Sequence, residues 1–246
     1  MRTPLIACLV PLLAIALMAV PAHANEWTIE SFQKQAKQSD WEGYDVGTSF
    51  TTKTAAVSPM GSRNTEERKT LMKIEDENVT IKIEQKQEDG TWKETRTEKV
   101  PRKKKVTFEM KDAGTAKIKV GETEYDCKVV EGVKTEDGKA EKARFWVHDQ
   151  KGILQMEMPA GPGMMIKMTA TKLDYEKTIG DVTLKDMRSF KAEFPGGVMN
   201  MEVCLNSPEQ MISQKMNMEQ QGMKMSQNAE ITALTIKKKA AAVTTK

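Results

Sequence analysis

The sequence contains few of the residues on which most enzymes and metal sites depend. It has 246 residues but only two histidines and three cysteines, and aromatic residues make up 5% of it. His23 and Cys8 fall within the first 24 residues, which leaves His148 as the single histidine of the rest. A catalytic nucleophile usually needs a base beside it, and zinc sites usually need closely spaced Cys and His. Both patterns are missing, as is a glycine-rich phosphate loop. We therefore expect a non-catalytic protein without a cofactor.

An excess of one charge is also missing. The chain carries 38 Lys and Arg against 35 Asp and Glu, a formal net charge of +3 at pH 7. Proteins that bind nucleic acid usually concentrate basic residues on one face, so nucleic acid is not expected as a partner. The basic run over 99–105 is interpreted as a solvated loop, with contact to an anionic envelope surface as the alternative. The basic, alanine-rich tail over 237–246 is expected to be disordered.

A long apolar run occurs only at the N-terminus. Residues 1–24 combine Arg2, an apolar stretch over 5–20 and an A-x-A site at 22–24, which is typical of a signal peptide. The mature protein would begin at Asn25 and be periplasmic or secreted. No later stretch approaches the roughly 20 apolar residues of a membrane-spanning helix, so we expect no transmembrane segment after signal removal.

Two cysteines remain after residue 24, and two interpretations of them stay open. In an oxidising compartment a pair of cysteines favours a disulfide between Cys127 and Cys204. The local patterns differ, however, because Cys127 lies among apolar alternating residues while Cys204 shares a strand face with Asn200 and Glu202. Two free thiols are the alternative.

Alternation of apolar and polar residues with a period of two dominates the chain after Gly43. Val79, Ile81 and Ile83 illustrate it, each separated by a polar residue. Further alternating segments lie at 116–120, 125–129, 144–148, 153–158, 164–173, 198–205 and 223–236. Long strands with one charged face are typical of antiparallel sheet that is wetted on one side. The prediction is a mainly β fold, α+β at most: a curved antiparallel sheet or half-barrel over 25–236, with 174–182 as a potential boundary of a second unit.

Two segments favour a helix instead. Ile29, Phe32 and Ala36 recur on one helical face, which predicts a short helix over 25–40. The sequence Ser-Pro-Glu-Gln at 207–210 has the form of a capping box with proline at the first helical position. A helix from there to about Gln214 is the alternative to a strand.

Methionine is abundant in this sequence, in contrast to histidine, cysteine and the aromatic residues. Of 18 methionines, 16 follow residue 24, and several form Met-x-Met pairs that place both side chains on one face of a strand. Methionine is flexible and recurs on surfaces that accept varied apolar partners. We expect a concave face that binds an apolar small molecule, a lipid or a lipidated partner. The lining would be Met156, Met158, Met165, Met168, Met199 and Met201. A closed, dry core in a structural or partner-docking protein is the alternative.

The stretch KMNMEQQGMKM over 215–225 allows a second interpretation. A four-residue hairpin loop at 219–222 would place Met218 opposite Met223 and Met216 opposite Met225. Four thioethers on one patch suit Cu(I), so these four methionines are the alternative metal ligands. The buried face of a hairpin accounts for the same pattern and is preferred.

Three segments carry a resemblance to a known group of proteins. They are WEGYDVG at 41–47, IKVGETEYDC at 118–127, and FWV at 145–147 continuing to GILQMEM at 152–158. Over 41–173 the chain resembles uncharacterised secreted β-rich proteins of planctomycete-type bacteria, for which no catalytic residue can be carried over. The resemblance implies a curved antiparallel sheet with an N-terminal helix, similar in outline to periplasmic lipoprotein carriers. The segment after Leu173 departs from it.

Overall fold

The computed structural model describes residues 41–103, 106–136, 139–161, 164–204, 206–220 and 222–238. All regular elements in these ranges are β-strands. The strands are Ser49–Ser58 (β1), Gly61–Ile74 (β2), Asn78–Lys86 (β3), Trp92–Pro101 (β4), Val106–Val120 (β5), Thr123–Glu136 (β6), Lys139–His148 (β7), Gly152–Gly161 (β8), Met164–Ile179 (β9), Val182–Phe194 (β10), Gly197–Cys204 (β11), Met211–Gln220 (β12) and Met223–Thr235 (β13). Within the described ranges no helix has the length and apolar character of a membrane span.

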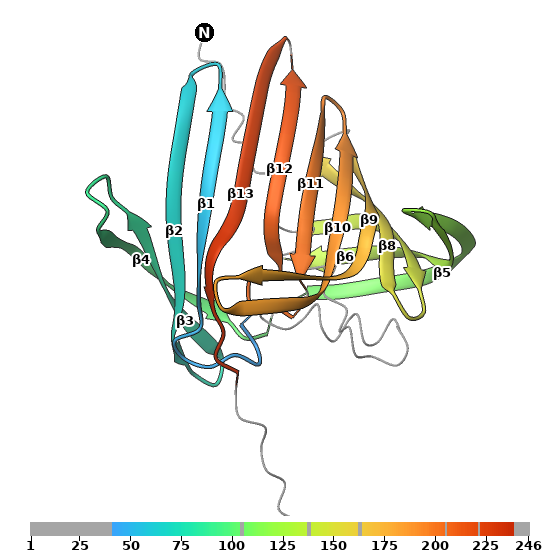
Figure 1. The fold of residues 1–246 in the computed structure, drawn as a ribbon. Coiled ribbons are helices and arrows are strands. Elements are labelled where there is room, and N and C mark those ends of the chain that lie inside the picture. Colours follow the sequence, from blue (N-terminus) through green and yellow to red (C-terminus); the bar gives the residue numbers. More distant parts are fainter. Residues whose placement is uncertain are drawn as a thin grey trace, which may run out of the picture.

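The strands form one 13-stranded antiparallel sheet in the order β4-β3-β2-β1-β13-β12-β11-β10-β9-β8-β7-β6-β5. Strands that follow each other in the chain pair as hairpins, except β4 and β5, and β1 pairs with β13. The sheet does not close, because β4 and β5 are its two edges (Figure 1). The predicted fold class, a curved antiparallel sheet, is confirmed. The signal peptide, the helix over 25–40 and the tail after 238 lie outside the described residues.

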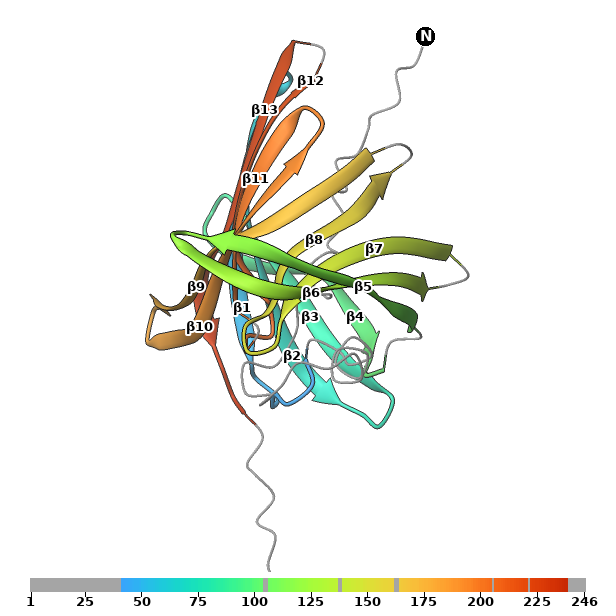
Figure 2. The same ribbon diagram turned by 90° about the vertical axis from the view of Figure 1, so that its right-hand side faces the viewer.

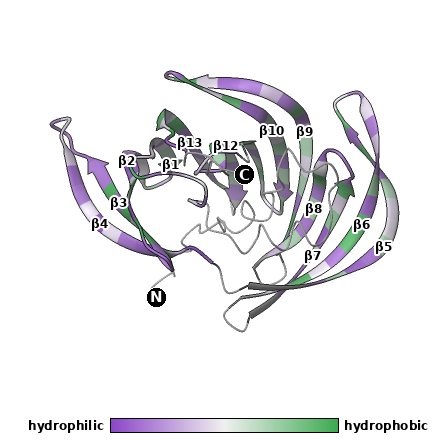
Figure 3. Cartoon of the chain, turned by 90° about the horizontal axis from the view of Figure 1, so that it is seen from below, coloured by the Kyte–Doolittle hydropathy of each residue, from purple (hydrophilic) through white to green (hydrophobic). Residues whose placement is uncertain are grey.

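The sheet is strongly curved. Seen from below it forms a trough with β4 and β5 at its two rims, and β5–β7 run across the direction of β11–β13 (Figures 2 and 3). Register shifts interrupt several pairings, for example between Thr51 and Thr52 and between Trp146 and Val147. Such β-bulges bend strands and increase their twist. Asp174 and Asp186 adopt positive φ values of 53° and 56° in the β9–β10 hairpin, whose end contacts β13.

The two faces of the sheet differ in character. Most members of two buried clusters share one face of the sheet, which the strand pairings define and which is called the inner face here. The first, called the methionine cluster, includes Phe145, Met156, Met168, Met199, Met201 and Met216. The second, called the Phe50 cluster, includes Trp41, Phe50, Leu71, Val79, Ile81 and Ile83. Trp41 stacks on Phe50 with ring centroids 5.6 Å apart, which anchors the segment before β1 to the sheet.

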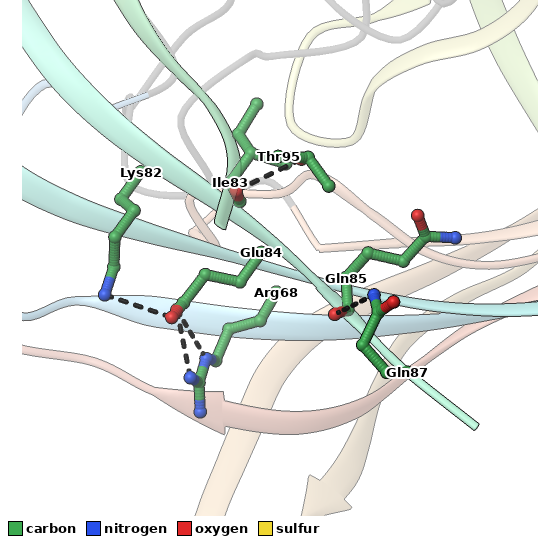
Figure 4. A network of polar contacts seen from close by, with 7 residues as sticks. All are labelled: Arg68, Lys82, Ile83, Glu84, Gln85, Gln87 and Thr95. Atoms are coloured by element: carbon green, nitrogen blue, oxygen red, sulfur yellow. Dashed lines mark hydrogen bonds and ion pairs between the residues drawn. The ribbon is translucent and has the colours of Figure 1, made fainter. Parts of the chain in front are cut away.

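The outer face is held by ion pairs, as Figure 4 shows for β2 and β3. Glu84 accepts from Arg68 at 2.9 Å and pairs with Lys82 at 3.1 Å. The Arg68 guanidinium also lies 4.5 Å from the ring centroid of Trp92. The hydrogen bond from Arg68 is the largest influence on Glu84 and lowers the pKa of this carboxyl. The charged side chains of this face are therefore compatible with contact with water.

The helix considered after Ser207 does not form. Residues 207–210 make a bend, and β12 begins at Met211. The stretch over 215–225 is a hairpin, but its register differs from the predicted one by two residues. Met218 lies opposite Met225, Gln220 opposite Met223, and Met216 opposite Gln227. The turn is shorter than predicted because Gly222, with φ of 77°, supports a tight turn between β12 and β13.

The disulfide considered between Cys127 and Cys204 is absent, because both cysteines are free and buried. Cys127 on β6 belongs to the methionine cluster, and Cys204 on β11 belongs to the Phe50 cluster. Four strands lie between β6 and β11, which amounts to roughly 24 Å along the sheet at about 4.8 Å per strand. A disulfide needs Cα atoms within about 7 Å, so the topology keeps the thiols apart.

Candidate functional site

A row of apolar side chains crosses six neighbouring strands on the inner face. Residues that lie directly opposite each other on paired strands share a face of the sheet. From β7 to β12 the successive partners are Phe145, Met156, Met168, Ala192, Met199 and Met216. Each is at most 4% exposed. Four thioethers thus lie in one continuous band across the trough.

A second band runs beside the first. Ala170, Phe190 and Met201 are successive partners on β9, β10 and β11, and Met158 lies opposite Ile166 on β8 and β9. Five of the six methionines named from the sequence as lining residues therefore share the inner face. They are Met156, Met158, Met168, Met199 and Met201, and each is at most 3% exposed.

Met165 is the exception. It lies three residues before Met168 on β9, an odd number, so its side chain projects from the opposite face of the sheet. It is 53% exposed, whereas Met168 is fully buried. The expectation that Met165 lines the concave face is wrong. The sequence already contained this signal, because residues three positions apart on one strand, such as Met165 and Met168, project from opposite faces.

Met165 instead borders a hollow of about 670 Å³ formed by β5 to β9. Its charged lining comes from neighbouring strands and includes Lys111, Glu131, Arg144 and Glu157. Glu131 pairs with Lys111 at 3.1 Å and with Arg144, and these contacts lower the pKa of its carboxyl, the Arg144 hydrogen bond most. These charges already stabilise one another, so the hollow offers no free charged group of this set to a ligand.

The four methionines considered for Cu(I) all lie on the same face of the β12–β13 hairpin but differ in exposure. Met218 and Met225 are direct partners, whereas Met223 lies opposite Gln220 and is 47% exposed. Met216 is 4% exposed and belongs to the inner-face row. Direct partners have Cβ atoms about 5 Å apart, which is close enough for two thioethers to share one soft metal ion. No group of three or more His, Cys, Asp or Glu in the described ranges could hold a metal.

A polar network on the outer face was not anticipated from the sequence. Glu202 accepts hydrogen bonds from Tyr175 at 3.0 Å, from Ser213 at 2.7 Å and from Lys177. Tyr175 also contacts the Ser189 hydroxyl at 2.8 Å, so the network spans β9 to β12. Burial alone would raise the pKa of Glu202, but the three hydrogen bonds together lower it. These residues alternate with buried ones as in any exposed strand face, so no sequence signal distinguished them.

His148 has a local structural role. Its Nδ1 atom accepts from the backbone amides of Gln150 and Lys151, both at 3.2 Å, and so closes the turn between β7 and β8. Its ring meets that of Tyr125 edge-on at 5.3 Å. A ring nitrogen already occupied by two amides is poorly placed to act as a general base.

Comparisons with known proteins give weak likenesses. No protein-family profile matches the chain, and no curated protein sequence does. The chain is similar to an outer membrane lipoprotein-sorting protein domain from Vibrio parahaemolyticus, with a TM-score of 0.37 and 11% identity, over 80% of this chain and 88% of that one. It is also similar to MucB in its complex with MucA, with a TM-score of 0.17 and 12% identity, over 82% of this chain and 96% of that one. Both TM-scores and both identities are too low for either likeness to bear on the function.

Proposed function

We propose that this protein is an exported, non-catalytic envelope protein that binds an apolar ligand, such as an acyl chain or a lipidated partner, on the inner face of its sheet. The observation that carries the proposal is the band of methionines across β8 to β12. A rigid core is usually built from Leu, Ile, Val and Phe, whereas methionine adapts to partners of different shape.

Ligand entry needs side-chain rearrangement, because the five inner-face methionines are at most 3% exposed. Two features make rearrangement plausible on physical grounds. The sheet is unclosed, with β4 and β5 as its two edges, so its curvature is not locked by a ring of hydrogen bonds. The methionine side chain also has three rotatable bonds and changes rotamer at low cost.

Export and the lack of catalysis belong to the same proposal. The signal-like segment over 1–24 supports a periplasmic or secreted location. The ion-paired outer face is compatible with either compartment. His148, the single histidine after residue 24, is occupied in a turn, which supports a binding role over a catalytic one.

The test is binding of a fluorescent apolar probe to the purified chain over 25–246, with native mass spectrometry of the same sample. We expect probe binding by the unaltered protein and by the Met199→Leu/Met201→Leu variant, which keeps the band apolar. Met201→Glu should abolish binding because it buries a charge among apolar side chains. Met165→Glu, a matched change on the outer face, should leave binding intact.

Circular dichroism establishes that each variant is folded before its binding is compared. A folded Met201→Glu protein that binds the probe as well as the unaltered protein would overturn the proposal. So would an unaltered protein that binds no apolar probe.

A structural or partner-docking protein with a closed core is the second candidate. The near-complete burial of the five inner-face methionines favours it. In that case native mass spectrometry gives the bare mass of the chain and no apolar probe binds.

Cu(I) binding at Met216, Met218, Met223 and Met225 is favoured only by the Met218–Met225 pair. Changing all four to Leu preserves apolar volume and removes sulfur, so an unchanged copper affinity would exclude this site.

A further inference from the structure

A buried arginine lies on the inner face beside the methionine bands. Arg188 on β10 is 5% exposed and lies two residues before Phe190, so both side chains share the inner face. Its direct partner on β11 is Val203, a member of the methionine cluster. The preceding residue, Met187, belongs to the Phe50 cluster and projects from the opposite face of β10.

The Nε atom of the Arg188 guanidinium is desolvated without a hydrogen-bond partner among the described residues. No carboxylate among these residues forms an ion pair with the guanidinium. Asp174 and Asp186 are close enough to act on it electrostatically, but Asp174 is held by Lys151 at 2.6 Å and Asp186 accepts from Asn206 at 3.5 Å. Burial is the largest influence and lowers the pKa of Arg188, yet arginine stays protonated in proteins.

Two further unsatisfied polar atoms lie in the segment between β11 and β12. Among the described residues, the buried side-chain nitrogen and oxygen atoms without a partner are Arg188 Nε, Ser207 Oγ and Gln210 Oε1. The backbone oxygen of Gln210 accepts from Cys204 at 2.8 Å, and Cys204 lies opposite Met187. The three unsatisfied atoms therefore come from neighbouring segments. Buried polar groups without partners are rare in folded proteins, so each of them calls for an explanation.

We propose that the apolar ligand of the inner face carries an anionic head, a carboxylate or a phosphate monoester at the end of a single acyl chain, and that Arg188 binds this head. The inference rests on the proposed function, because it assigns the head group of the same ligand. The guanidinium presents N–H donors in a planar fork that matches carboxylate and phosphate oxygens.

The dimensions of the inner face fit such a ligand. Phe194 lies six positions after Arg188 along β10, which corresponds to roughly 20 Å at about 3.3 Å per residue. The methionine bands at Phe190 and Ala192 cross β10 within this span. A long acyl chain with its head at Arg188 could therefore run along β10 across both bands.

The test compares ligands that differ only in the head group. Palmitate, 1-palmitoyl lysophosphatidate and the neutral 1-hexadecanol displace a bound apolar probe from the delipidated chain over 25–246. We expect at least one anionic ligand to bind about tenfold more tightly than hexadecanol. The ratio between palmitate and lysophosphatidate then assigns the head as carboxylate or phosphate.

The variant Arg188→Met should lose this preference while still binding hexadecanol, and Arg188→Lys should keep part of it. Arg144→Met, which removes a guanidinium from the outer face, is the matched control and should behave as the unaltered protein. If Arg188→Met does not fold, the head-group comparison between the unaltered protein and Arg188→Lys still tests whether Arg188 binds the anionic head.

The outcomes separate the two proposals. Equal binding of all three ligands would overturn the anionic head and leave the apolar carrier standing. A preference that persists in folded Arg188→Met would overturn the role of Arg188. Binding of none of the ligands would overturn the carrier proposal and this inference together.

Discussion

The ring of Phe194 lies directly over Gly197, its partner across β10 and β11. A Cβ atom added at Gly197 would lie 2.5 Å from Cε2 of Phe194 and 2.8 Å from the backbone oxygen of Asn217. Side-chain carbons do not approach so closely, so only glycine allows the ring and β12 to pack at this position. Gly197 thereby lets Phe194 complete the end of the methionine cluster.

Gly197→Ala is expected to destabilise the protein by about 1–3 kcal/mol, because the added methyl group must displace both the ring and the backbone oxygen. Urea denaturation measures the loss. Gly132→Ala is the matched control within a strand, since its nearest neighbour would be Phe145 Cε2 at an ordinary 3.4 Å. An equal loss in both variants would show that the Phe194 contact is not the cause.

Two methionines of β9 should differ sharply in their contribution to stability. Met168→Ala removes a fully buried side chain from the inner face and is expected to cost about 2–5 kcal/mol. Met165→Ala removes a side chain that is 53% exposed and should change the free energy of unfolding by about 0.5 kcal/mol or less. The same denaturant titration compares them. Similar losses would contradict the assignment of the two residues to opposite faces.

The network around Glu202 predicts a dependence of stability on pH. Burial acts to raise the pKa of this carboxyl, but hydrogen bonds from Lys177, Ser213 and Tyr175 outweigh burial and lower it. A carboxyl with a lowered folded pKa stabilises the fold above its unfolded pKa of about 4.3 and loses this contribution as pH falls through the folded value. Glu202→Gln should therefore cost about 1–2 kcal/mol near pH 7.

The difference in unfolding free energy between Glu202→Gln and the unaltered protein should shrink as the pH falls below about 4. Denaturant titrations at several pH values measure it. A difference that stays constant down to low pH would mean that ionisation of Glu202 contributes nothing. Comparing variant with unaltered protein at each pH cancels the contribution of other carboxyls such as Glu84.

The two buried thiols should be slow to react. Burial raises the pKa of Cys127 to about 11 and also raises that of Cys204, so little thiolate exists at about pH 8. We expect a disulfide-exchange reagent to modify neither residue in the folded protein and both after denaturation. A mass increase by two hydrogens on reduction would instead reveal a disulfide and contradict the separation of the two residues across the sheet.

Several elements of the fold were predictable because they depend on neighbours in the chain. The alternation at Val79, Ile81 and Ile83 correctly predicted one buried strand face. The strands over 49–74 and 182–194 were missed, because long polar stretches and bulges obscure their period. Simple alternation fails over 145–147, where Phe145, Trp146 and Val147 are all buried, so both faces of β7 are covered there.

Local patterns alone predict a β-sheet with methionine on one face of several strands, since side-chain direction along a strand depends only on residue parity. Which strands lie side by side, and in which register, depends on long-range packing. This packing placed Met168 opposite Met156, separated Cys127 from Cys204, and buried Arg188 beside the methionine bands. The physical reason is that pairing between strands depends on turns, bulges and curvature, which combine residues far apart in the chain and leave no mark in any single local pattern.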